Sequence, residues 1–213
     1  MLLDKNRAVG PECGGRVAGV PARGWFLLGA LAVAATPAAA QPAAPAPLFE
    51  TFKRVCADTQ GSFARASAHP DVQSWKRFPL PIPLPVKDVK LSEKSIRVKS
   101  FEGEALRMFF AGTGSTTFAD QPARFEFCAV GGKPADLQAV IRELQALTGQ
   151  PSIAGEKGTT SFRYHQSPGG KRTPLPAGKL RQVAKGHGPG EVVSIDAAVQ
   201  RGQTIISYTS IKP

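Results

Sequence analysis

Three histidines, His69, His165 and His187, are the side chains of this chain best suited to move protons near neutral pH. His165 lies in an extended stretch and could act as a general base if the fold placed it in a cleft with Asp196, although alternation equally allows a half-exposed surface histidine. No two histidines stand three or four residues apart, the spacing that would put both beside one zinc ion on a helix. The sequence therefore predicts no metal site and no cofactor. It leaves a small hydrolase, with His165 or His187 beside a carboxylate, as an alternative function.

Two glycine-rich runs, at residues 111–116 and 155–159, are similar in composition to phosphate-binding loops. Such a loop ends in Gly-Lys followed by Ser or Thr and then a helix, so that backbone N–H groups and the Lys surround the phosphates. The first run has no Lys, and in the second the Lys precedes the last Gly. We therefore interpret both runs as turns. The chain also has no Gly-x-Ser-x-Gly or Ser-x-x-Lys motif, so nucleophilic hydrolysis has no local signature.

A candidate binding face is formed by Arg97, Lys99 and Arg107, which share one side of two predicted strands with Phe101 and Phe109. Cations interleaved with aromatic rings suit phosphate contact and base stacking. The alternative, which we favour, is a solvated strand edge whose charges discourage aggregation. The three cations are nevertheless the binding residues that the sequence predicts best.

The leading forty residues have the pattern of a secretory signal peptide. An apolar run at 25–35 follows Arg16 and Arg23, and small residues at 38–40 form a cleavage site. The run is too short to cross a bilayer, which requires about 20 residues. We therefore predict a signal peptide at 1–40, a periplasmic or secreted location, and no transmembrane segment after the leader is removed.

Removal of the leader would leave two cysteines, Cys56 and Cys128, in an oxidising compartment. A disulfide between them is the structural prediction, and closure of such a long loop would stabilise the fold by about 4 kcal/mol. A reactive thiol or a metal ligand is the alternative. Neither alternative is supported by a Cys-x-x-Cys pair or by a histidine near either cysteine in sequence.

The chain is strongly basic, with 27 Lys and Arg against 16 Asp and Glu and a formal net charge of +11. Such an excess could attract an anionic envelope polymer, a lipid headgroup or an acidic protein partner, whereas export argues against nucleic acid. The cations are scattered along the chain and never run more than two together. Solubility alone is therefore a sufficient explanation of the charge.

Composition and periodicity divide the remainder into a Pro/Ala-rich disordered tail at 41–47 and a single α+β domain at 48–213. A second proline cluster, at 78–85, is expected to run extended, either as a ligand for a partner or packed on its own domain. Helical spacing of apolar residues, or alternation with a period of two, predicts the following elements: helices near 48–56, 63–68 and 137–147, and strands near 96–98, 106–110, 125–129, 160–165, 192–199 and 204–211, with 179–184 as a further strand.

These blocks of helices and strands predict an antiparallel sheet with N-terminal helices and one central amphipathic helix packed on it. Alternation places Cys128 on the opposite side of its strand from Phe125 and Phe127. If the disulfide forms, the first helix must cover the face that bears Cys128. We expect the helix at 137–147 to cover the other face.

One short pattern near the start of the domain combines Cys56, Thr59, Gly61, an alanine-rich turn and Trp75. In these residues the chain resembles small secreted proteobacterial proteins of unknown function. It departs from them at Ser74, where that group has glycine before tryptophan. The resemblance covers only the N-terminal part of the domain, and it implies a fold and an exported location only. The sequence as a whole predicts an exported binding or accessory protein and favours a non-enzymatic role.

Overall fold

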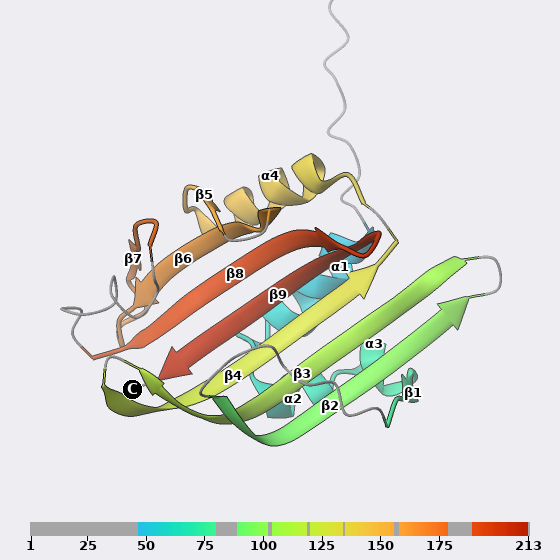
Figure 1. Ribbon diagram of the computed structural model, residues 1–213, viewed down its shortest axis with the longest axis horizontal. Coiled ribbons are helices and arrows are strands. Elements are labelled where there is room, and N and C mark those ends of the chain that lie inside the picture. The colour runs from blue at the N-terminus through green and yellow to red at the C-terminus, as the bar shows by residue number, and fades with distance from the viewer. Residues whose placement is uncertain are drawn as a thin grey trace, which may run out of the picture. The chain divides into compact units, whose positions relative to one another are not determined.

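The computed structural model describes most of the chain beyond residue 46, and these residues form a single α+β domain (Figure 1). The predicted signal peptide, residues 41–46 of the tail, most of the second proline cluster and the predicted strand at 179–184 lie outside the described residues. The described ranges are 47–79, 89–101, 104–118, 120–133, 135–155, 158–178 and 189–212.

The domain is built on one nine-stranded sheet in which every described pairing is antiparallel. From edge to edge the order is β1 (Lys76–Arg77), β2 (Val89–Phe101), β3 (Glu104–Phe118), β4 (Gln121–Gly132), β9 (Gln203–Lys212), β8 (Glu191–Gln200), β6 (Thr160–Gln166) and β5 (Ile153–Ala154), with β7 (Arg172–Pro174) also paired to β6. The last strand in chain order, β9, therefore lies in the middle and joins β4 to β8.

The meander β2–β3–β4 is confirmed, but the interpretation of residues 111–116 as a turn is wrong. They lie in the middle of β3, where Gly112 pairs with Lys94 and Gly114 with Leu91. A Cβ atom at Gly114 would collide with the backbone of β2, and one at Gly112 would collide with the ring of Phe127. The glycines thus permit close approach within the sheet. Residues 156–157 of the second run lie outside the described residues; on either side of them, Gly155 N–H donates to Thr159 O between β5 and β6.

The α-helices of the described ranges pack on one face of the sheet; in Figure 1, α1, α2 and α3 lie behind the strands, and α4 is visible along the edge near β6 and β8. They are α1 (Pro47–Phe52), which continues as a π-helical turn, η1 (Lys53–Ala57), then α2 (Phe63–Ser67), α3 (Pro70–Gln73) and α4 (Leu137–Thr148). We call this the helix face; it bears the side chains of Phe109, Cys128 and Ile195. The opposite, second face bears Phe110, Phe127 and Asp196. No helix in the described ranges is both long and apolar enough to cross a membrane.

Helix α4 has well-defined ends and a single buried stripe. The Asp136 side chain accepts hydrogen bonds from the first backbone N–H groups of the helix, and Gly149 closes it in a left-handed conformation with φ of 64°. Val140 and Leu144 are fully buried in the same cluster as Cys128. The prediction that this helix covers the face of Phe125 and Phe127 is therefore wrong: α4 shares the helix face with the N-terminal helices.

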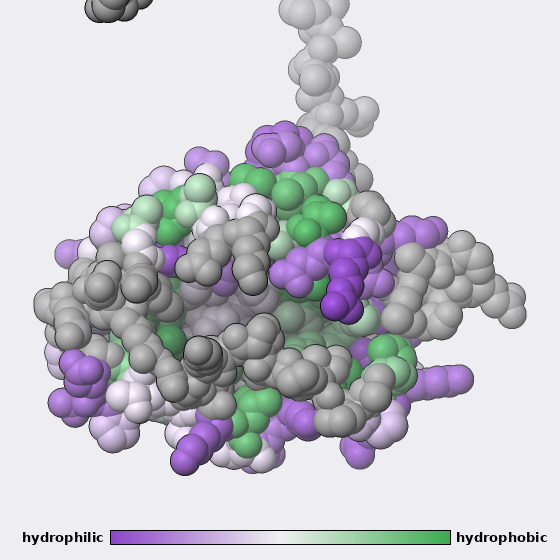
Figure 2. Space-filling view, in the orientation of Figure 1, coloured by the Kyte–Doolittle hydropathy of each residue, from purple (hydrophilic) through white to green (hydrophobic). Residues whose placement is uncertain are grey.

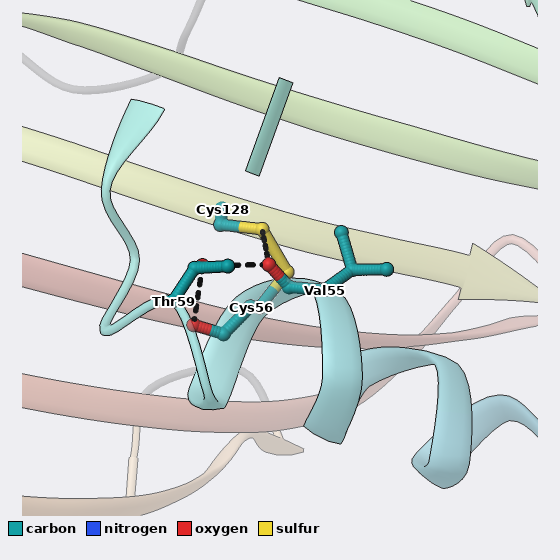
Figure 3. The surroundings of a disulfide bond; sticks show 4 residues. All are labelled: Val55, Cys56, Thr59 and Cys128. Atoms are coloured by element: carbon teal, nitrogen blue, oxygen red, sulfur yellow. Dashed lines mark hydrogen bonds between the residues drawn. A yellow bond between two sulfur atoms is a disulfide. The ribbon is translucent and has the colours of Figure 1, made fainter. Parts of the chain in front are cut away.

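The predicted disulfide between Cys56 and Cys128 is present and ties η1 to β4 across 72 residues (Figure 3). The Cα atoms of the two cysteines are 5.4 Å apart. Beside the bridge, the Thr59 hydroxyl donates to Val55 O at 2.6 Å, and Gly61 N–H donates to Cys56 O at 2.8 Å. The N-terminal helices are thus fixed to the sheet by a covalent bond as well as by packing.

The second face is apolar at one end, where the ring of Phe127 packs at a tilt against Phe110 and Phe125, with centroid distances of 5.2 Å and 5.6 Å respectively. Leu175, from the segment after β7, is buried in the same cluster. Figure 2 shows this side of the molecule: hydrophilic and hydrophobic patches both lie around the rim, and a hollow over the central strands has a paler floor. The two faces therefore differ in covering and in chemistry.

Candidate functional site

The three predicted binding residues lie on the helix face and not on an open sheet surface. In the register of β2 and β3, Arg97 is opposite Phe109, and Lys99 is opposite Arg107. Arg97 is only 7% exposed, and its Nη1 donates to Gln73 O at 3.0 Å, at the end of α3. Lys99 and Arg107 are half-buried. The structure thus places the three cations on one face, as alternation predicts. Arg97 is buried, however, whereas Lys99 and Arg107 are half-buried.

Arg97 lines an open groove between the helices and the first two strands of the sheet. The groove has a volume of about 830 Å³. Its polar and charged lining comprises Ser67, Gln73, Arg77, Glu93, Lys94, Ser95 and Arg97, and its apolar lining includes Phe63 and Phe78. The lining thus includes three cations and one carboxylate, with Arg77 and Arg97 on the helix face and Lys94 at the strand edge, on the second face. We call this site the basic groove.

Two arginines meet directly in the basic groove, because Arg77 of β1 is the cross-strand partner of Arg97 in β2. Side chains that are directly opposite in an antiparallel pair have Cβ atoms about 5 Å apart, and like charges there repel each other. Exposed Lys94 lies three residues before Arg97 on β2 and lines the groove from the strand edge, with its side chain on the second face. The sheet register thus concentrates positive charge at the point where the groove opens.

The groove also contains two buried polar atoms, Ser67 Oγ and Arg97 Nε, that have no hydrogen-bond partner among the described residues. A buried polar group without a partner costs about 1–3 kcal/mol, and more if it is charged. A guanidinium can present two parallel N–H groups to a carboxylate or phosphate. Arg97 uses Nη1 on Gln73, so its Nε side is the one that remains for a ligand.

A second polar cluster lies on the second face, around Asp196 of β8. The Asp196 carboxylate accepts hydrogen bonds from the Ser161 hydroxyl at 2.5 Å and from the Ser194 hydroxyl at 3.1 Å. Burial raises the pKa of Asp196 above its ordinary value, and the two hydroxyl groups and Arg163 partly oppose that shift. The cluster holds a proton-accepting group, but among the described residues no hydrogen bond joins a histidine to Ser161 or Ser194.

The two described histidines do not form a catalytic pair with Asp196. His165 lies opposite Val192, whereas Asp196 lies opposite Ser161, four residues further along β6 and so about 13 Å away. His165 is buried rather than half-exposed. His69 is the N-cap of α3, where its Nδ1 accepts from Asp71 N–H at 3.2 Å, and His187 lies outside the described residues.

Sequence reasoning missed Arg77, Lys94 and Ser67 in the basic groove, as well as Ser161 and Ser194 beside Asp196. Arg77 belongs to a two-residue strand, which is too short to give a periodic signal. The serines become partners of Asp196 only through the register of β6 and β8. The available signal for Ser194 was its position two residues before Asp196 in an alternating strand.

Comparisons of the chain with protein-family models, curated proteins and solved structures each found no match. Within the described ranges, no group of three or more His, Cys, Asp or Glu side chains is placed to hold a metal ion. The functional argument therefore depends on the basic groove and the Asp196 cluster. Of these, only the groove combines an opening, a charge excess and polar atoms without partners.

Proposed function

We propose that this protein is an exported binding module, acting in the periplasm or outside the cell, whose basic groove binds a carboxylate or phosphate group. The bound carboxylate or phosphate belongs to an anionic envelope component or to a partner protein. The signal-peptide pattern and the disulfide support an oxidising location. The location in turn argues against nucleic acid as the ligand.

The observation that carries the proposal is the directly opposed pair Arg77 and Arg97, with Arg97 buried and its Nε without a partner among the described residues. An oxyanion between the two guanidinium groups would offset their mutual repulsion and give Nε an acceptor. Exposed Lys94 adds charge at the opening, which accelerates the approach of an anion. Each of these features favours a negatively charged ligand over a neutral one.

Binding is better supported than hydrolysis. A hydrolase of the kind considered above needs a histidine, a carboxylate and a nucleophile within hydrogen-bond reach. Ser161 and Asp196 meet that distance, but the sheet register holds His165 away from both. The basic groove requires no such convergence, because its charges already lie together.

The test uses Arg77→Gln, which removes one exposed charge from the groove without cutting a buried group. Arg142→Gln is the matched control, since Arg142 is exposed on α4 and outside the groove. Binding is measured by calorimetry with inorganic polyphosphate, a hexaglutamate peptide and phosphatidylglycerol vesicles, which separate the sources of the anion. We expect Arg77→Gln to weaken binding of at least one probe by about tenfold or more, and Arg142→Gln by less than about twofold.

Wild-type binding should also weaken as salt is raised, because the attraction is electrostatic. Equal losses in the two variants would mean that the probes respond to net charge alone. The basic groove would then not be the binding site.

A further inference from the structure

The outer edge of the sheet at β2 is much longer than the strand that covers it. β2 has 13 residues and pairs with β3 from Val89 to Phe101, with register shifts at Leu91/Glu93 and Lys99/Phe101, whereas β1 has two residues and pairs only with Val98 and Arg97. Phe78 N–H adds one bond to Ile96 O at 2.9 Å. Among the described residues, no strand pairs with the outer edge of β2 from Leu91 to Ser95.

The backbone of this uncovered stretch faces the basic groove. Ile96 O points outward to Phe78, and in a strand the backbone groups two residues away point to the same side. The N–H and C=O groups of Lys94 therefore also point outward, where Lys94, Ser95 and Ile96 line the groove. An unpaired strand edge is a template for an added strand.

The side chains around this edge define what an added strand should carry. A strand placed there would direct every second side chain toward the helix face, where Arg97 and Arg77 lie. Acidic residues suit those positions. Phe78, one of two exposed large apolar side chains among the described residues at 40% exposure, lies at the mouth of the groove and suits apolar residues in between.

We propose that the basic groove receives an extended acidic segment of a partner protein, which adds to the outer edge of β2 beyond β1 and places a carboxylate between Arg77 and Arg97. This inference rests on the proposed function and specifies its ligand. A lipid headgroup or polyphosphate could meet the cations, but a peptide strand can also donate to and accept from the outward C=O and N–H groups of Lys94. Lys94 further disfavours pairing between two copies of this edge, because the lysines of the two copies would repel each other.

The first experiment compares two peptides of equal length and charge that alternate Glu and Val. One is N-methylated at every second residue on its hydrogen-bonding side, and the other is not. Binding to the full wild-type chain is measured by fluorescence anisotropy. We expect N-methylation to weaken binding by about tenfold, because methylated amides cannot donate to β2.

The second experiment separates the Lys94 backbone from its charge. Lys94→Gln removes the charge alone, whereas Lys94→Pro also removes the outward N–H, which proline tolerates at a strand edge. We expect Lys94→Pro to bind the unmethylated peptide about tenfold more weakly than Lys94→Gln. Both variants should bind polyphosphate equally. Should Lys94→Pro fail to fold, slowing of Lys94 amide hydrogen exchange by the peptide in the wild type replaces it.

Each unfavourable result identifies which proposal is wrong. If both peptides bind equally well and Arg77→Gln weakens both, anion binding stands and strand addition is overturned. If polyphosphate binds through Arg77 but neither peptide binds, the ligand is not a peptide strand. If Arg77→Gln changes the binding of no probe, the proposed function itself fails.

Discussion

The two faces of the sheet bury their carboxylates in different ways. On the helix face, Glu126 is paired with Arg124 at 3.3 Å and with Lys212 at 3.7 Å, and it accepts the Phe63 backbone N–H at the start of α2. On the second face, Asp196 is held by the hydroxyl groups of Ser161 and Ser194. Cations balance the charge of Glu126, whereas Asp196 accepts hydrogen bonds from neutral hydroxyl groups.

This difference follows from what covers each face. The helix face receives α1 to α4 and the disulfide, so its sheet residues meet helix ends and apolar side chains. Glu126 in effect caps α2 from the sheet, since Ser62, the N-cap residue, makes no side-chain cap. The second face has no helix over its described part. We infer that the helix face supplies most of the stability, and the second face tolerates polar groups.

The largest expected effect comes from removing the bridge on the helix face. The double variant Cys56→Ala and Cys128→Ala should lower the free energy of unfolding by about 4 kcal/mol, because a 72-residue loop is no longer closed in the unfolded chain. Urea denaturation measures this. Reduction of the wild-type protein is the control: it should lower stability by a similar amount, whereas it should leave the double variant unchanged. A loss below about 1 kcal/mol in the double variant would show that helix packing alone fixes the face.

Two buried leucines compare the faces directly. Leu144 of α4 is fully buried on the helix face, and Leu175 is 3% exposed on the second face. Leu144→Ala should lower unfolding free energy by about 3–4 kcal/mol, and Leu175→Ala by about 2 kcal/mol, since the irregular segment around Leu175 can collapse into the cavity. Urea denaturation of both variants measures which of the two losses in unfolding free energy is larger. The reverse order would contradict the inference that the helix face contributes more.

Asp196 should make stability depend on pH in a characteristic direction. Because burial raises its pKa in the folded state, the folded protein holds this proton more tightly than the unfolded chain does. This contribution is fully present below the unfolded pKa and is lost as pH rises through the folded pKa. The stability of Asp196→Asn relative to wild type should therefore increase from pH 4 to pH 7 in urea titrations. A constant difference would mean that the serine hydroxyls offset burial completely.

The smallest effect is expected at Lys212, which lies between Glu126 and Glu191. Its side chain is 49% exposed, and its distances to the two carboxylates are 3.7 Å and 3.3 Å. Lys212→Ala should lower the free energy of unfolding by about 1 kcal/mol or less, because Glu126 keeps its ion pair with Arg124 and its hydrogen bond from Phe63 N–H. The loss should shrink in high salt. A loss above about 3 kcal/mol would show that Glu126 depends on Lys212 for its charge balance.

Much of the fold could be predicted from local patterns, because the long strands alternate and α4 carries both of its end signals, Asp136 and Gly149. The disulfide could be predicted because Cys56 and Cys128 are the two cysteines after the leader pattern. The face chosen by α4 could not be predicted. An amphipathic stripe shows that a helix packs against something, and both faces of this sheet offer apolar clusters.

The candidate site could be predicted only in part. Alternation correctly placed Arg97 with Lys99 and Arg107, but burial of Arg97 depends on α3, which supplies Gln73 O. The decisive neighbour, Arg77, becomes visible only through pairing between segments about twenty residues apart in the sequence, which no local period encodes. The glycines of β3 were misjudged for a related reason. Glycine marks a turn or a close approach, and only the neighbouring strand distinguishes the two.

The central place of β9 makes completion of the sheet depend on the end of the described chain. Until residues 203–212 are available, β4 and β8 each expose an open edge, and the two halves of the sheet have no shared strand. A polypeptide that emerges N-terminus first would therefore pass through a stage at which two half-sheets each have an unpaired strand edge. A holding chaperone would be most useful at that stage.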